Sequence, residues 1–175
     1  MVYSHKIHEK QADISFSRYQ WQQGILVALS AVSSGTFLTL VFGLFGNSTL
    51  TSIVTSFCAL LVSWMSLGAK TFKFDETSAI HRDVASSLWD VRESYISLIA
   101  DMMSGRIADI DARKRRDELQ SLARDVYSAA PRTSGKAFVR AQDGLKNNEE
   151  MTFTTREIDL FLPEALRLGE DEGQS

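Results

Sequence analysis

The sequence has a long stretch without charge and almost no cysteine. Residues 19–69, between Arg18 and Lys70, hold no charged side chain, although 23% of the 175 residues are charged. The single cysteine, Cys58, excludes an intramolecular disulfide framework, and it is read as a small apolar packing residue. A charge-free stretch of this length exceeds what a buried helix of a soluble protein needs and indicates a segment that lies in lipid.

Catalytic motifs are also missing. The sequence holds no HExxH, no CxxC and no glycine-rich phosphate loop, and no segment alternates as a strand does. The three histidines have no paired nucleophile, and His81 is read as structural. A net charge of −3 does not indicate a nucleic-acid binder. We therefore expect an all-α protein that is not an enzyme, with no catalytic residue, metal or cofactor.

The charge-free stretch divides into two apolar runs. Residues 24–45 and 50–69 would give about 33 and 30 Å of helix, and both lengths match a hydrocarbon core of about 30 Å. Residues 46–49 between them have turn chemistry and allow only an antiparallel return. We predict a two-helix transmembrane hairpin over residues 21–69.

Basic residues flank this hairpin at one end only. Trp21 and Trp64 fall toward that same end, as in an aromatic belt, and the turn has no basic residue. The positive-inside rule places both termini in the cytoplasm. The basic residues are Lys6, Lys10 and Arg18 before the first span and Lys70 and Lys73 after the second.

Each span has a face of small or hydroxyl side chains. Both faces can serve to pack the two helices of one hairpin together. Alternatively, one face packs while the serine face of the second span borders a water path in an oligomer. Neither span has an ionisable side chain, which argues against a coupled pump. The candidate packing residues are Ala31, Gly35, Thr39 and Gly43, and the candidate pore-facing residues are Ser52, Ser56, Ser63 and Ser66.

The rest of the chain divides into three segments. Residues 1–20 mix apolar and charged side chains and form either an interfacial amphipathic segment or a frayed tail. Residues 70–168 carry helical patterns and are predicted to be a cytoplasmic helical bundle, and the acidic residues 169–175 a disordered tail. The expected fold class is an all-α membrane protein, in which a transmembrane hairpin precedes this bundle.

Apolar residues between 84 and 103 recur in steps of three and four along two adjacent rows. Such a wide stripe suits a helical bundle. Gly105 predicts the end of this helix, Asp109 or Asp111 a cap for the next, and Thr133 or Ser134 a cap for a third. The spacing of Thr154 and Glu157 predicts a capping box before a last short helix. The candidate oligomer-interface residues on the stripe are Leu88, Trp89, Tyr95 and Met102.

Charge is uneven within the predicted bundle. Residues 106–140 carry a net charge of +4, and residues 143–175 a net charge of −6. The acidic end can pack against the basic middle, or both can simply be solvated. The other interpretation is a phosphate-bearing ligand or anionic lipid at the basic cluster, since the arginine fork suits phosphate. The candidate contacts are Arg92, Arg113, Arg115 and Arg116.

Four short motifs follow the hairpin in a fixed order. They are Leu88-Trp89-xx-Arg92-xx-Tyr95, Arg115-Arg116-Asp117-x-Leu119, Tyr127-xxx-Pro131-xx-Ser134 and Glu157-Ile158-Asp159-xx-Leu162-Pro163. In this order, from the hairpin to Arg167, the chain resembles the SLATT family. These are two-transmembrane effector domains found with SMODS nucleotidyltransferases and SLOG sensors in bacterial conflict systems.

The resemblance implies a multi-pass protein of the bacterial inner membrane that acts in antiphage defence. Such an effector forms a homo-oligomer and permeabilises the membrane when a nucleotide second messenger signals infection. A cyclic oligonucleotide or a nucleotidyltransferase partner is the implied trigger, and it must act without a separate sensor domain. The competing hypothesis is a membrane-anchored scaffold that recruits a soluble partner through its helical domain.

Overall fold

The computed structural model describes residues 1–33 and 48–167. These described residues are helical and contain no strand, which confirms the all-α expectation. Two parts of the predicted chain lie outside the described residues. One is the end of the predicted first span, with the packing residues Gly35, Thr39 and Gly43, and the other is the tail 169–175. The helices are α1 (Val2–Ser33), α3 (Ser48–Phe72), α4 (Phe74–Met103), α5 (Asp109–Ala129), α6 (Gly135–Lys146), α7 (Thr155–Phe161) and a short 3-10 turn (Glu164–Leu166).

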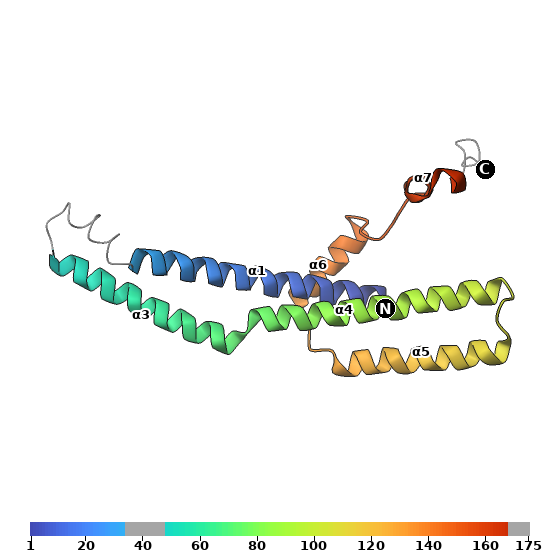
Figure 1. Ribbon diagram of the computed structural model, residues 1–175, viewed down its shortest axis with the longest axis horizontal. Helices are drawn as coiled ribbons and strands as arrows, with labels where there is room; N and C mark the ends of the chain where they lie inside the picture. The colour runs from blue at the N-terminus through green and yellow to red at the C-terminus, as the bar shows by residue number, and fades with distance from the viewer. Residues whose placement is uncertain (34–47, 168–175) are drawn as a thin grey trace.

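The helices form an elongated rod (Figure 1). The two halves of α1 lie against different partners, α4 near its N-terminus and α3 farther along. Lys73 alone separates α3 from α4, and its φ of 40° interrupts the helical run between them. The rings of Phe72 and Phe74 stack across this break at a centroid distance of 5.7 Å.

Residues 2–20 belong to the packed half of the rod as part of α1. Ala12 and Ile14 are buried, and so are several polar side chains of the same turns. Gln11 Oε1, for example, accepts hydrogen bonds from the backbone nitrogen and the hydroxyl of Ser134. Because these polar groups find partners on other helices, this stretch of α1 is buried despite its mixed composition.

The predicted apolar stripe of α4 forms the core. Val84, Leu88 and Val91 are buried on this helix, which lies against α1, while Leu98 joins Leu119 in a cluster with α5. α6 crosses α1 on another side. One chain therefore covers part of the stripe with its own helices, while Ile96, Ile99, Met102 and Met103 stay exposed.

Three predicted helix boundaries are confirmed by their caps. Gly105 follows α4 with a φ of 66°, a conformation that glycine adopts without strain. The Ser134 hydroxyl accepts a hydrogen bond from the backbone of Ala137 at the start of α6. Thr154 and Glu157 form the complete capping box, and the hydrogen bonds from Thr154 lower the pKa of the Glu157 carboxyl.

The start of α5 differs from the prediction. Its N-cap is Ala108, with no side-chain cap, while Asp109 and Asp111 lie in the first turn. These two carboxylates still favour the helix there, because they face the positive end of its dipole.

Candidate functional site

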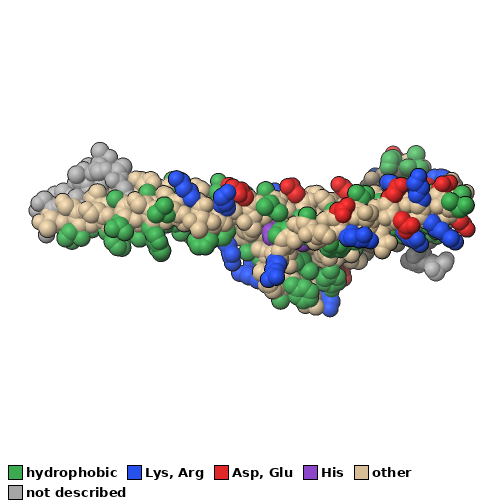
Figure 2. All heavy atoms as spheres, turned by 90° about the horizontal axis from the view of Figure 1, so that it is seen from below, with side chains coloured by type: hydrophobic (Ala, Val, Ile, Leu, Met, Phe, Trp, Pro, Cys, Tyr) green, Lys and Arg blue, Asp and Glu red, His purple; other side chains and the backbone are tan. Residues whose placement is uncertain are grey.

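One helical run of the described chain is long and apolar enough to cross a membrane. The run Ser52–Met103 contains an 18-residue window with a mean hydropathy of 1.7, of which only 6% is buried inside the structure. Figure 2 shows a matching division on the face in view: hydrophobic side chains line the end that contains α3, and most charged ones lie along the other half. Length and composition thus fit a membrane span at this end.

The four candidate pore-facing serines lie together on the surface of α3. At about 100° per residue they fall within an arc of about 80°. All four are exposed, and the Ser63 hydroxyl donates to the carbonyl of Ala59 at 3.0 Å. By contrast, Cys58, on another side of the helix, is buried. The serine face, Ser52, Ser56, Ser63 and Ser66, is therefore not covered by α1.

Bulky apolar side chains occupy the neighbouring arc of α3. They are 61–71% exposed, which is unusual for residues of this size in contact with water. α3 thus presents a hydroxyl strip beside an apolar strip, while Ala31, the one described candidate of the first span, is exposed on α1. The apolar strip consists of Ile53, Phe57, Leu60, Trp64 and Leu67.

The candidate phosphate contacts do not converge on one point. Arg92 lies over the Trp89 ring, 4.7 Å from its centroid, and pairs with Glu93. On α5, Arg115 pairs with Glu118 at 3.1 Å and Arg116 with Asp117 at 2.7 Å, and Arg113 is exposed. These pairs within single helices offset the positive charge of the cluster. The remaining positive charge is spread along an exposed helix surface.

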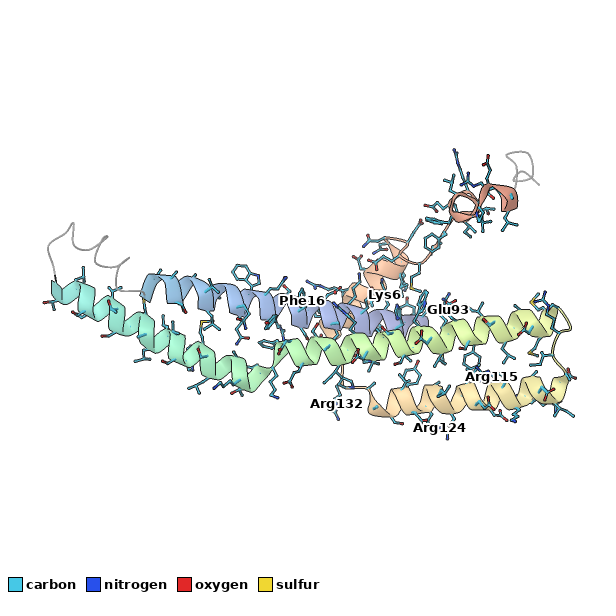
Figure 3. All side chains as sticks on the ribbon, in the orientation of Figure 1. Lys6, Phe16, Glu93, Arg115, Arg124 and Arg132 are labelled. Atoms are coloured by element: carbon cyan, nitrogen blue, oxygen red, sulfur yellow. The ribbon has the colours of Figure 1, made fainter. Side chains whose placement is uncertain are left out.

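A groove of about 640 Å³ lies between α4 and α5. Of the four candidate arginines, only Arg115 lines it, and Figure 3 labels this residue together with Glu93, another lining residue. Carboxylates outnumber cations in the groove, so it does not suit a phosphate-bearing ligand. Its charged lining residues are Glu93, Asp101, Asp111, Lys114, Arg115 and Glu118.

The candidate oligomer-interface residues are used mostly within one chain. Leu88 is fully buried, Trp89 is half-buried with its ring 5.1 Å from that of His5, and Tyr95 packs against the α4–α5 cluster. Leu88 has no exposed surface in the single chain. Met102 is 53% exposed and remains available.

A buried histidine pair joins α1 to α4. The Nδ1 atoms of His8 and His81 lie 2.9 Å apart, and the two residues are 6% and 2% exposed. One ring must donate and the other accept, so at most one proton fits between them. Burial lowers the pKa of both rings from 6.5, and the charge of His81 lowers the pKa of His8 further. The pair was not predicted from the sequence, because its members are 73 residues apart and His8 lies in residues 1–20, which were expected to be an interfacial segment or a frayed tail.

Two lysines of α1 converge on one carboxylate near α6. Lys6 Nζ lies 2.6 Å and Lys10 Nζ 2.8 Å from the two oxygens of Glu150, and Lys6 also pairs with Glu9 at 2.7 Å. Hydrogen bonds from Lys10 and Lys6 lower the pKa of the Glu150 carboxyl. Burial alone would lower the pKa of Lys6, but its hydrogen bonds to Glu150 and Glu9 outweigh this and raise it. We call Lys6, Lys10 and Glu150 the dilysine cluster; its only sequence signal was the spacing of the two lysines by one helical turn.

Within the part of the chain that the structure describes, no group of three or more His, Cys, Asp or Glu side chains is placed to hold a metal ion. No curated protein and no solved structure matches the chain. A comparison with known families matches residues 1–157 to SLATT_4, the SMODS and SLOG-associating 2TM effector domain family 4. This match covers most of the 175 residues and includes α3, the serine face and the dilysine cluster. The chain therefore belongs to the SLATT family of two-transmembrane effector domains.

Proposed function

We propose that this chain is a membrane effector of bacterial antiphage defence, which oligomerises and permeabilises the inner membrane when a nucleotide second messenger or a partner protein triggers it. Membership of a family of two-transmembrane effector domains associated with SMODS and SLOG supports the setting. The exposed serine face of α3 is the observation that carries the permeabilising role.

The exposure of this face bears on the choice between packing and pore lining. If Ser63 and Ser66 packed the two spans of one chain together, α1 would cover them, but they are exposed, whereas Cys58 is buried. A hydroxyl strip in lipid is less favourable than the apolar strip beside it, so it is best placed against other copies or against water. Two spans cannot enclose a water path, so the proposal requires several copies around an axis.

The proposed orientation places both termini in the cytoplasm. The basic residues near the charge-free stretch all lie at the end where α1 and α4 pack, and none lies at the opposite end. In this orientation the dilysine cluster and the histidine pair are on the cytoplasmic side, where a soluble trigger is present.

The scaffold function keeps one specific observation in its favour. α7 and the turn after it have no buried residue, and their apolar side chains are 51–77% exposed. A soluble partner could dock on this surface while the spans act only as an anchor. The residues are Ile158, Leu160, Phe161 and Leu166.

Dye release from liposomes separates the two functions. The purified chain is reconstituted alone and tested with a panel of cyclic di- and trinucleotides. Release on addition of one nucleotide supports the gated effector, and constitutive release supports an effector restrained by a missing partner. Absence of release under every condition contradicts permeabilisation and favours the scaffold.

Replacing Ser63 with leucine should reduce dye release about tenfold, because an apolar side chain in a narrow path promotes dewetting. Ile53→Leu, on the apolar strip of the same helix, is the matched control and should release dye as the parent does. Both variants should insert into liposomes equally, as judged by flotation. Equal release from Ser63→Leu and the parent would remove the serine face from the path.

A further inference from the structure

The dilysine cluster has the features of a binding site that is already filled. The side chains of Lys6 and Lys10 are 10% and 20% exposed, although lysine is seldom buried unless paired. Both ammonium groups point at the same position, and Figure 3 shows Lys6 where α1 crosses α6. The Glu150 carboxylate occupies that position with one oxygen on each lysine.

Without Glu150 the cluster would be an electropositive, partly desolvated position. Lys10 would lose the carboxylate that binds it, and Lys6 would keep Glu9. One negative charge would then face two ammonium groups. An anion with several oxygens, such as a phosphate group, can accept hydrogen bonds from both lysines as the carboxylate does.

The backbone that delivers Glu150 is strained. Glu149 and Met151, on either side, have φ of 51° and 77°, in the left-handed region that side chains other than glycine rarely adopt. The carboxylate itself fits over Gly144 only because this residue has no Cβ, which would lie 2.9 Å from its atoms. Strain of this kind persists only where surrounding contacts enforce it and often marks a segment that switches. The contacts that hold it here are the two lysines and two backbone hydrogen bonds, from Glu150 N to Gly144 O and from Thr152 N to Glu149 O.

From these observations we propose that Lys6 and Lys10 bind a phosphate-bearing ligand, and that Glu150 is a built-in competitor that the ligand displaces. Displacement relieves the loop and frees the connection from α6 to α7, whose apolar face is exposed. As a location for the trigger, this inference rests on the proposed function.

A soluble phosphate suits the site better than a lipid headgroup. Lys10 precedes the predicted start of the first span at Gly24 by 14 residues, or about 21 Å of helix, whereas the headgroup region is only about 5–8 Å thick. Both sources share the same chemistry, so the test must include each of them.

The test measures binding of inorganic phosphate and pyrophosphate to the full chain in nanodiscs of zwitterionic lipid, by calorimetry. Glu150→Gln keeps the size of the side chain and removes its charge, and it should tighten the dissociation constant at least about tenfold if Glu150 fills the site nine-tenths of the time. Glu149→Gln is the matched control, because it removes the same charge from the adjacent, exposed residue and should bind as the parent does.

A second variant removes the site itself. Lys10→Gln, introduced into Glu150→Gln, should abolish the gain, and circular dichroism checks that the helices remain. Equal affinity of Glu150→Gln and Glu149→Gln, or a gain that survives Lys10→Gln, would overturn the proposal. A gain seen only with nanodiscs of anionic lipid, and not with soluble phosphate, would overturn it in favour of a headgroup site.

The calorimetric experiment measures binding alone and does not depend on whether the chain permeabilises a membrane. Tightened phosphate binding in Glu150→Gln with no dye release under any condition would support the site and contradict permeabilisation. Dye release with no difference between the Glu150 and Glu149 variants would support permeabilisation and contradict the site.

Discussion

Replacing Leu88 with alanine should lower the free energy of unfolding by about 2–5 kcal/mol, the usual range for a leucine removed from a packed core. Leu88 is fully buried on the seam between α1 and α4, and both helices are fixed around it by polar contacts. The surrounding helices can therefore collapse only in part around the cavity. Chemical denaturation of the chain in detergent micelles, followed by circular dichroism, measures the loss.

Met102→Ala is the matched control for this variant. Met102 lies on the same helix and is 53% exposed, so its truncation should change stability by only about 0.5 kcal/mol. If Leu88→Ala instead left stability unchanged and altered only the number of subunits, measured by light scattering, the seam would lie between chains and the single-chain core would be wrong.

Acidification below about pH 6.5 should destabilise the packed half of the rod by up to about 1.4 kcal/mol per pH unit for each histidine of the His8–His81 pair. Because burial lowers the pKa of both rings, the unfolded chain binds more protons than the folded chain in this range. Stability is thus full above pH 6.5 and is lost as the pH falls toward the folded pKa values. Unfolding midpoints from pH 8 to pH 5.5 measure this slope.

His81→Asn supplies the comparison for this experiment. The asparagine amide can still donate to His8 Nδ1 but does not titrate, so the pH slope should fall to about half. His5 lies nearby, with its Nδ1 at the carbonyl of Ala85 and its Nε2 3.8 Å from Glu9, and it is present in both proteins. A slope that His81→Asn leaves unchanged would assign the pH dependence to groups outside the pair.

Local signals in the sequence were sufficient to predict several helix ends and the buried face of α4. Gly105, Ser134 and the Thr154–Glu157 box fix helix ends through hydrogen bonds within a few residues, and these were predicted correctly. The apolar stripe of α4 was also visible, because burial of Val84 and Leu88 follows helical periodicity.

The position of residues 2–20 could not be read in the same way. Lys6, His8 and Gln11 are buried by partners 73 to 144 residues away, on α4, at α6 and in the loop after it. Hydrophobic patterning treats such residues as exposed, so the segment resembled a tail. The ion pairs that offset the charge of the arginine cluster, in contrast, can be recognised in the sequence. Arg115 precedes Glu118 by three residues, and Arg116 precedes Asp117 by one.

α1 and its partner differ in how they transmit force. α1 runs without interruption from Val2 to Ser33, about 48 Å, and so forms one continuous rigid helix between the N-terminal contacts and the apolar end of the molecule. The antiparallel partner is interrupted at Lys73, between α3 and α4 (Figure 1). A displacement at Lys6 or His8 would therefore pass along one continuous helix, whereas a displacement of α4 would reach α3 only through the break at Lys73.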